Sequence, residues 1–442
     1  MELSEHNIVS RIHNSNAYFI VNVLSGNADV LTPEESLRLL NKEVLNDPEY
    51  IEKGYVVDPV EERKLFRRKY LDFIDTRDTD EIQLFYVPTY TCNFNCAYCY
   101  QEGYAQTGRD NTDAVNAFFE YIQENFKTRR KYITLFGGEP LLPGEAGKRF
   151  LEEFIDKCNL HQLDLAVVTN GYTLEEYLPL LSKASIREIQ VTLDGTEFVH
   201  NSRRPLKNGA GSFASIVRGV DLAIAAGVRI NLRVVVDRDN INNLPELAQF
   251  AIDKGWTMSA FFKTQLGRNY ELHYCQSQQS KLYSRIDLYR DLYSLIRQNP
   301  HMLEFHKPAY SLSKFLFEQG ELPEPLFDAC PGAKTEWAFD FTGRIYSCTA
   351  TVGKPGEELG TFFPVVNLKN ALVESWQQRD VLSIKPCGNC NLRLACGGGC
   401  ASVAYNREKN LHAPDCRPVK ELLELGVSLY SFDKDESQPT EQ

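Results

Sequence analysis

The chain contains an apolar segment, Ile82-Gln83-Leu84-Phe85-Tyr86-Val87, and shortly after it the loop Cys92-Asn93-Phe94-Asn95-Cys96-Ala97-Tyr98-Cys99. The apolar segment predicts a buried strand, and the loop carries three cysteines in a C-x3-C-x2-C spacing. Thiolates so arranged can bind three irons of a cubane [4Fe–4S] cluster, which needs four ligands. The remaining open iron indicates chemistry rather than electron storage alone. The alternative is a zinc knuckle, although zinc sites usually combine C-x2-C with a second cysteine pair elsewhere.

The composition restricts the class of protein. The 442 residues allow two or three domains, and the net charge of −12, without a basic block, argues against a nucleic-acid partner. No secretory signal is visible in Met1–Val23, and no apolar run approaches the roughly 18 residues that span a bilayer. A soluble cytoplasmic protein without membrane contact is therefore expected. Its twelve cysteines then favour metal ligation over disulfides.

From Glu81 onward, strand-like segments alternate with amphipathic helices. Strands are expected at Ile82–Val87, Tyr132–Phe136, Leu165–Thr169, Glu188–Leu193, Arg229–Val236 and Thr257–Phe262. Helices are expected at Asp113–Phe126, Gly147–Cys158, Leu174–Lys183, Phe213–Ala226 and Leu244–Lys254. Six such units predict an α/β fold with a parallel sheet, closed or nearly closed like part of a TIM barrel. The cysteine loop follows the first strand and so lies at the carboxyl end of the sheet, where barrel active sites form.

The flanking segments predict further units. Residues 1–76 combine a hairpin at Tyr18–Leu31, a capping-box helix from Thr32 and a charged helix at Pro59–Tyr70. This pattern fits a small winged-helix-like unit, or equally an extension that braces the next domain. The barrel is assigned to residues 77–265. A helical bridge, with a helix near Ser280–Arg297, is assigned to residues 266–329. Residues 330–432 are assigned to a loop-rich domain organised around metal, and residues 433–442 to a disordered polar tail.

Polar motifs follow successive predicted strands. These motifs are Gly137-Gly138-Glu139-Pro140, Thr169-Asn170-Gly171 and Thr192-Leu193-Asp194-Gly195, the last followed by His200, Arg203 and Arg204. Paired glycines allow close backbone approach to a ligand, the glutamate can accept from an ammonium group, and an arginine can bind a carboxylate bidentately. Each motif alone is also typical of an ordinary turn. Together, at the ends of neighbouring strands, they indicate one polar pocket for a zwitterion.

These motifs resemble the radical S-adenosylmethionine (SAM) superfamily. The resemblance implies a partial (β/α)6 barrel in which the open iron of the Cys92, Cys96 and Cys99 cluster chelates SAM, and a reduced cluster that cleaves SAM to a 5′-deoxyadenosyl radical. Tyr98 would lie against the adenine side, Gly137–Glu139 would hold the ammonium, and Arg204 would lie near the carboxylate. Pro140, Asn170 and Thr192 complete the implied SAM-binding set. Catalytic residues acting on substrate stay unknown.

The downstream cysteines resemble the SPASM domain, which carries two auxiliary [4Fe–4S] clusters. Their pattern is Cys330-x12-Gly343-x4-Cys348, Cys387-x2-Cys390-x5-Cys396-x3-Cys400 and finally Cys416. The resemblance, which spans roughly residues 82–420, assigns Cys330, Cys348 and Cys400 to the first auxiliary cluster. It assigns Cys387, Cys390, Cys396 and Cys416 to the second, giving three clusters in all. The alternative is a zinc ribbon.

Two positions depart from the anaerobic sulfatase maturases. Those relatives carry a further cysteine where this chain has Glu336, and an aspartate, the supposed base of side-chain oxidation, where it has Thr349. The first auxiliary cluster therefore has an apparently open iron. A substrate thiolate, Glu336 or a distant residue such as Cys275 could fill it. Cys158, on a barrel helix, is expected to be a buried apolar residue.

Three functions remain after these observations. The first is a peptide maturase that installs a thioether or carbon–carbon crosslink in a ribosomally made precursor. Its N-terminal unit would recognise the leader of the precursor by strand addition, and a flavodoxin- or ferredoxin-type protein would be the reductant. The second is a sulfatase-type maturase that oxidises a cysteine or serine to formylglycine. The third is a non-catalytic iron–sulfur or zinc protein for electron transfer or scaffolding.

Overall fold

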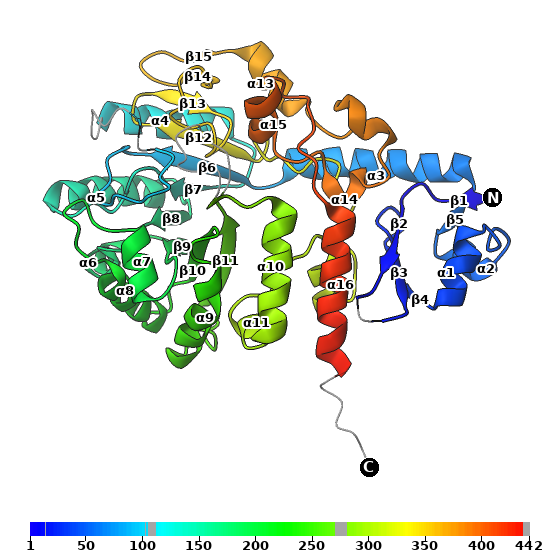
Figure 1. Ribbon diagram of the computed structural model, residues 1–442. Coiled ribbons are helices and arrows are strands. Elements are labelled where there is room, and N and C mark those ends of the chain that lie inside the picture. Colours follow the sequence, from blue (N-terminus) through cyan, green and yellow to red (C-terminus); the bar gives the residue numbers. More distant parts are fainter. Residues whose placement is uncertain (14, 102, 105–111, 270–280, 436–442) are drawn as a thin grey trace.

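A computed structural model describes residues 1–13, 15–101, 103–104, 112–269 and 281–435 (Figure 1). Its centre is a sheet of ten strands in the order β11-β10-β9-β8-β7-β6-β12-β13-β14-β15. The six parallel barrel strands are β6 Ile82–Val87, β7 Lys131–Leu135, β8 Leu165–Thr169, β9 Ile186–Thr192, β10 Ile230–Val236 and β11 Phe262–Arg268. The predicted parallel α/β succession is confirmed. The sixth predicted strand, Thr257–Phe262, is wrong. Ser259 N donates to Trp256 O and Phe262 N donates to Ser259 O, which forms a turn, and the strand therefore begins only at Phe262.

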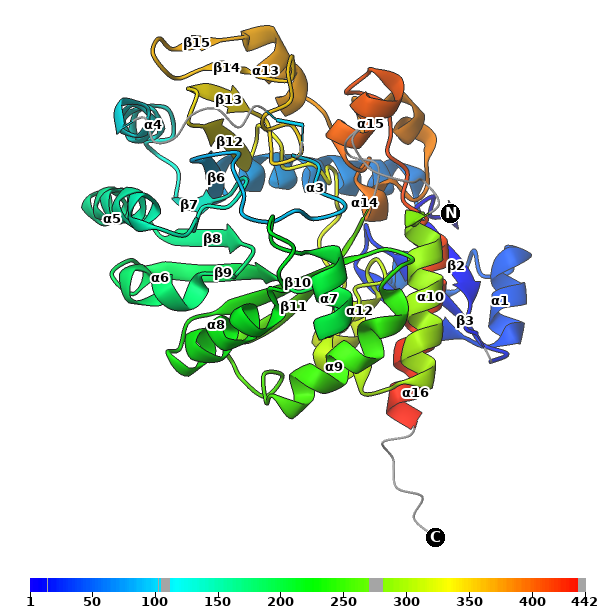
Figure 2. The same ribbon diagram turned by 60° about the vertical axis from the view of Figure 1, so that its left-hand side comes forward.

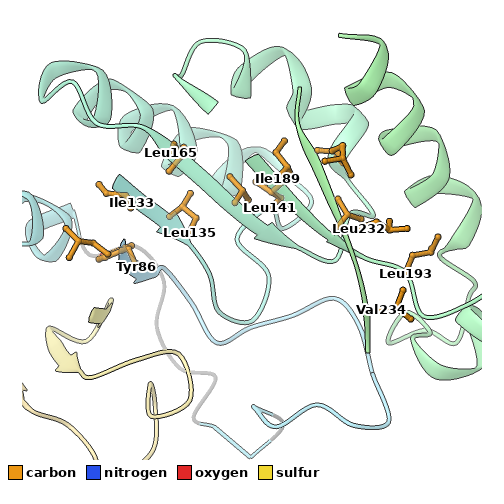
Figure 3. Close-up of a cluster of buried hydrophobic side chains, with 14 of the residues drawn as sticks. Tyr86, Ile133, Leu135, Leu141, Leu165, Ile189, Leu193, Leu232 and Val234 are labelled. Carbon is orange, nitrogen blue, oxygen red and sulfur yellow. The ribbon is translucent and has the colours of Figure 1, made fainter. Parts of the chain in front are cut away.

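Helices cover one face of the barrel strands (Figure 2). They are α4 Thr112–Asn125, α5 Glu145–Leu160, α6 Leu174–Leu181, α7 Glu197–Arg203, α8 Phe213–Ala225 and, after the short 3-10 helix η1 Ile241–Asn243, α9 Leu244–Asp253. Most of the alternate strand residues are apolar and pack against these helices, as Ile133, Leu165 and Ile189 do in Figure 3. Cys158 on α5 is part of this core, as expected. The intervening residues, such as Gln83, Phe85 and Glu188, give the opposite face of the sheet both polar and apolar side chains.

The barrel does not close. Strand β12, Glu336–Asp340, pairs in parallel with the free edge of β6, with Glu336 opposite Gln83. An antiparallel run of β13 Arg344–Tyr346, β14 Gly360–Thr361 and β15 Asn367–Leu368 extends the sheet further. Trp337 and Phe339 of β12 pack on the α4 side and enlarge the barrel core. Because β12 satisfies the β6 backbone, the sheet stays open and continues into the C-terminal region, which is consistent with the expected partial TIM-like barrel.

The first 80 residues contain a three-stranded antiparallel sheet and three helices. The elements are β1 Glu2–Leu3, β2 Asn7–Arg11, β3 Tyr18–Asn22, β4 Asn27–Leu31, α1 Pro33–Leu40, α2 Pro48–Glu52, β5 Val56–Val57 and α3 Pro59–Thr79. The predicted hairpin and the Thr32–Glu35 capping box are confirmed. Helix α3 runs beyond the predicted end at Tyr70. One sheet face packs on α1 and α2, while the other packs on the C-terminal region near Cys387 and Cys396.

The rest of the chain is helical or irregular. The helices are α10 Arg285–Gln298, α11 Met302–Phe305, α12 Ser313–Gln319, α13 Asn370–Gln377, η3 Lys385–Asn389, α14 Arg393–Cys396, α15 Ala401–Glu408 and α16 Val419–Asp435. Because α16 extends to Asp435, the first three residues of the predicted disordered tail are helical instead. Residues 436–442, like Cys275, lie outside the described residues. Among the described helices, none combines the length and apolarity needed to cross a membrane.

Candidate functional site: the carboxyl ends of the barrel strands

The three-cysteine loop leaves β6 and is held by backbone hydrogen bonds to the segment after α7. Asn95 N donates to Pro205 O at 2.9 Å, and Ala97 N donates to Arg203 O at 3.2 Å. Cys92, Cys96 and Cys99 are unbridged and partly buried. Burial, the main cause, raises the pKa of Cys92 to about 12 and that of Cys96 to about 11. The loop therefore holds thiols that need a strongly bound cation to become thiolates.

The three thiols of this loop are the kind of donor that binds a cubane iron–sulfur cluster. In the part of the chain that the structure describes, no three His, Cys, Asp or Glu side chains converge as the ligands of a single ion would. The thiolates of a cubane cluster bind separate irons and do not share one centre. The thiols nevertheless lie near each other, since the charge of Cys96 contributes to the raised pKa of Cys92 and that of Cys99 to the raised pKa of Cys96. The donor set thus fits an iron–sulfur cluster.

The glycine motif after β7 lies directly against this loop. Gly138 N donates to Thr89 O at 3.0 Å, and Glu139 N donates to Thr91 O at 2.9 Å. A Cβ atom on Gly138 would lie only 2.2 Å from the carbonyl oxygen of Thr91. Gly137 has a φ of +135°, which a side chain disfavours. Both glycines are therefore required for the close approach of the two loops.

Glu139 connects the β7 and β8 loops. Its Oε1 accepts from Leu141 N at 2.8 Å and Thr169 Oγ1 at 2.6 Å, and its Oε2 accepts from Asn170 N at 2.6 Å. Burial raises the pKa of Glu139, and these donors oppose that effect. Three of the four carboxylate acceptor positions are used, which leaves one on Oε2. The side chain of Asn170 in turn donates to Asn93 of the cysteine loop at 2.8 Å. Pro140 and Thr192 are buried beside these groups at the strand ends.

The segment after β9 brings two arginines to the cysteine loop. Arg203 forms a buried ion pair with Asp237 at 2.7 Å and a longer one with Asp194 at 3.4 Å. Arg204 donates to the Tyr98 hydroxyl at 2.6 Å, and Tyr98 donates to Asp194. The Nε atom of Arg204 is buried without an acceptor. Arg204, rather than Arg203, therefore keeps a donor for an incoming carboxylate.

His200 belongs to the support of this segment. Its Nδ1 accepts from the backbone of Asp194 at 3.2 Å, and its Nε2 lies 3.0 Å from Ser212 Oγ. Burial lowers the pKa of His200 well below its usual range, so the ring is neutral. Its role is to hold the loop that follows β9.

Removal of the two arginines should have different consequences. Arg203→Ala leaves Asp194 and Asp237 buried without their cation, so we expect a loss of about 3–5 kcal/mol in unfolding free energy, measured by chemical denaturation. Arg204→Ala should instead weaken binding of SAM, the ligand that the resemblance implies, by roughly 10- to 100-fold, the value of one or two hydrogen bonds to a charged group, measured by equilibrium dialysis. Equal effects of the two variants on SAM affinity at unchanged stability would contradict this assignment.

The seven downstream thiols lie in two groups. Burial raises the pKa of Cys348, and the neighbouring charges of Glu336, Cys330 and Cys400 raise it further. Burial likewise raises the pKa of Cys387 to about 11, with additional contributions from Cys396, Cys390 and Cys416. Each group thus gathers residues far apart in the sequence. The first comes from the segments before β12 and after β13 and from the residue before α15, and the second from η3, the residue after η3, α14 and the segment before α16.

A cavity of about 330 Å³ lies on the face of the barrel sheet opposite the helices. Its polar and charged lining includes Gln83, Thr134, Arg187, Glu188, Gln190, Arg233, Lys263 and Thr349, and its apolar lining includes Phe85, Phe136 and Val168. Thr349 adjoins Cys348, so the cavity wall reaches the first downstream thiol group. The strand residues of this lining were not predicted as site residues from the sequence. The available signal was a polar residue at several alternate strand positions, such as Gln83 and Gln190, which shows no chemistry until the strands are assembled.

Known proteins share these features. Residues 86–251 match the family model described as the radical SAM superfamily. This segment, which holds most of the barrel strands, is a radical SAM domain. The mycofactocin maturase MftC of Mycobacterium ulcerans is 27% identical over 344 residues, which cover 74% of this chain and 85% of the relative. The GTP 3′,8-cyclase of Campylobacter fetus is 32% identical over 175 residues, 38% of this chain, and the chain spans only about half (51%) of that relative.

Solved structures share the fold of this radical SAM protein. Native anSMEcpe with bound AdoMet has a TM-score of 0.60 at 16% identity, covering 80% of this chain and 97% of the other. Streptococcus suis SuiB bound to the precursor peptide SuiA has a TM-score of 0.52 at 14% identity, covering 94% of this chain and 98% of the other. The superfamily implies SAM and a [4Fe–4S] cluster, and the donor set of the Cys92–Cys99 loop fits that cluster.

Proposed function

We propose that this radical SAM protein is a peptide maturase that installs a thioether or carbon–carbon crosslink in a ribosomally synthesised precursor. The observation that carries the proposal is the cavity whose wall starts on the barrel strands and ends at Thr349 beside a second thiol group. An enzyme of this design would bind a substrate side chain in the cavity, next to that thiol group. The match to MftC over 74% of the chain supports maturation of a peptide.

The cofactor assignment forms part of the proposal. Cys92, Cys96 and Cys99 would hold the SAM-binding cluster, which supplies a carbon radical for hydrogen abstraction when SAM is bound. The SAM contacts would come from Tyr98, Gly137, Gly138, Glu139, Pro140, Asn170, Thr192 and Arg204. The two downstream thiol groups would form the auxiliary clusters of a SPASM domain. A flavodoxin- or ferredoxin-type protein would supply the electron.

The N-terminal sheet supports a leader-binding role of a winged-helix-like unit. Its edge strands are β2 and β4. Helix α16 covers β2, where Ser10 Oγ donates to Glu424 at 3.1 Å and His13 N donates to Ser428 Oγ at 2.7 Å. Among the described strands, β4 pairs with β3 alone, and Val30 on β4 is 64% exposed. A leader segment would therefore add to β4.

Hydrogen exchange tests this docking site. A synthetic copy of the short peptide encoded beside this gene should slow amide exchange at Asn27–Leu31 by roughly tenfold or more, because strand addition pairs exposed backbone groups. The opposite edge, Asn7–Arg11, provides the internal control and should not change, since α16 already covers it. Equal protection of both edges, or of neither, would contradict leader binding at β4.

The enzymatic proposal has a direct test. Anaerobically reconstituted protein, given dithionite, SAM and the same peptide, should yield methionine, 5′-deoxyadenosine and a peptide lighter by two hydrogen atoms. In this balance one hydrogen atom goes to 5′-deoxyadenosine, and the second leaves the peptide as a proton, released to solvent, and an electron, which a downstream iron–sulfur cluster would accept. The absence of 5′-deoxyadenosine would refute the radical reaction. An aldehyde on the peptide would instead support the formylglycine alternative, which the replacement of the base position by Thr349 disfavours.

A further inference from the structure

Glu336, the first residue of β12, is a partly buried carboxylate without a cationic partner. Its Oε1 accepts from Thr349 N at 3.0 Å and from Thr349 Oγ1 at 3.4 Å. Within the described residues, no lysine, arginine or histidine forms an ion pair with it; the nearby Lys334 instead pairs with Asp328 at 2.6 Å. Buried carboxylates are normally paired with a cation or bound to a metal. Thr349 engages only Oε1, so Oε2 is available to a cationic group.

The backbone brings this carboxylate to the first downstream thiol group. The hydrogen bond from Thr349 N holds the Glu336 carboxylate next to Cys348, which directly precedes Thr349 in the sequence. A tight turn links it to Cys330, because Glu336 N donates to Pro331 O at 3.0 Å and Ala333 N donates to Ser347 O at 2.9 Å. The charges of Glu336, Cys330 and Cys400 all act on the Cys348 thiol. The Glu336 carboxylate therefore lies in the neighbourhood of all three thiols of this group.

The strand alternation turns Glu336 toward the same side as the cavity. Trp337 and Phe339, at alternate positions of β12, pack into the helix-covered core. Glu336 is out of phase with them and therefore faces the other side of the sheet. Glu336 lies opposite Gln83 in the β6–β12 register, and Gln83 lines the cavity together with Thr349. The carboxylate is thus held at the cavity end beside the thiols by a backbone donor.

We propose that the carboxylate of Glu336 is the fourth protein ligand of the first auxiliary cluster, together with Cys330, Cys348 and Cys400. This inference rests on the proposed function, which assigns a cluster to these thiols. It removes the open iron suggested by the cysteine count. A substrate thiol would then meet a cluster that already has four protein ligands. One of these ligands is a carboxylate oxygen, which binds the iron of a soft cluster site less tightly than a thiolate does.

The test uses full-length protein in which Cys92, Cys96 and Cys99 are all alanine, so that only the auxiliary clusters contribute. This background should hold about eight irons per chain. Its dithionite-reduced electron paramagnetic resonance spectrum should not change on addition of 2-mercaptoethanol. Adding Glu336→Gln should alter the signal of one cluster and make it respond to the thiol. Adding Glu336→Cys should again give a signal that does not change on addition of 2-mercaptoethanol, because the cysteine thiolate provides a charged fourth ligand.

A matched control is Glu188→Gln in the same background. Glu188 lines the same cavity but is paired with Lys263 at 2.5 Å, so its removal should leave the spectrum unchanged. A thiol response in the background protein, or a Glu336→Gln spectrum identical to the background, would overturn Glu336 as ligand. A background with about four irons or fewer would instead refute the two auxiliary clusters on which the inference rests.

Discussion

Replacement of Cys96 by alanine is expected to abolish SAM cleavage and to lower the iron content from about twelve to about eight atoms per chain. Cys96 is the central thiol of the loop that leaves β6, and its raised pKa shows that burial disfavours a free thiolate there. Without the third ligand, the cluster that binds SAM should be lost, while the two downstream groups keep theirs. Iron and sulfide assays, together with 5′-deoxyadenosine formation after dithionite reduction, measure both effects.

Cys158→Ala is the matched control for this variant. Cys158 is 1% exposed in the core of α5 and lies far from the thiol groups in sequence. Its loss should lower the unfolding free energy by about 1 kcal/mol through a small cavity and leave the iron content unchanged. If Cys96→Ala keeps all its iron and still forms 5′-deoxyadenosine, the loop does not hold the SAM cluster.

Gly138→Ala is expected to weaken SAM binding by about 100-fold, equivalent to nearly 3 kcal/mol. The added methyl group would lie 2.2 Å from Thr91 O and 2.5 Å from Tyr90 O, both backbone atoms that cannot rotate away. The β7 loop and the cysteine loop must therefore separate, which displaces both sides of the site by a fraction of an ångström or more. Equilibrium binding of SAM to the reconstituted protein measures the effect.

Gly103→Ala gives the corresponding control. This residue follows the cysteine loop, and a Cβ atom there meets nothing within 4 Å. SAM affinity should stay within about twofold of the parent protein, since surface changes of this kind have small energetic effects. Equal losses for the two alanine variants would mean that the loop contact at Gly138 does not shape the site.

The local features of the fold were predictable because their causes are local. Strands β6 and β8 have the predicted bounds, since a run of apolar and β-branched residues between polar turns specifies them. The Thr32–Glu35 capping box formed as expected because its partners are three residues apart. The sixth strand was misplaced because Thr257–Phe261 has strand-like composition, yet hydrogen bonds around Trp256 favour a turn there.

The sequence by itself determined the cysteine loop, the strand-end motifs and the radical SAM family, because each depends on residue type and short spacing. Only the tertiary structure decided that β12 joins β6, since this pairing connects residues some 250 positions apart, such as Glu336 and Gln83, through backbone groups that carry no sequence signal. It also separated Arg203, which is engaged by buried aspartates, from Arg204, which keeps a buried free donor. Charge balance depends on neighbours in space, and for the same reason only the fold exposed Glu336 as a carboxylate without a cation.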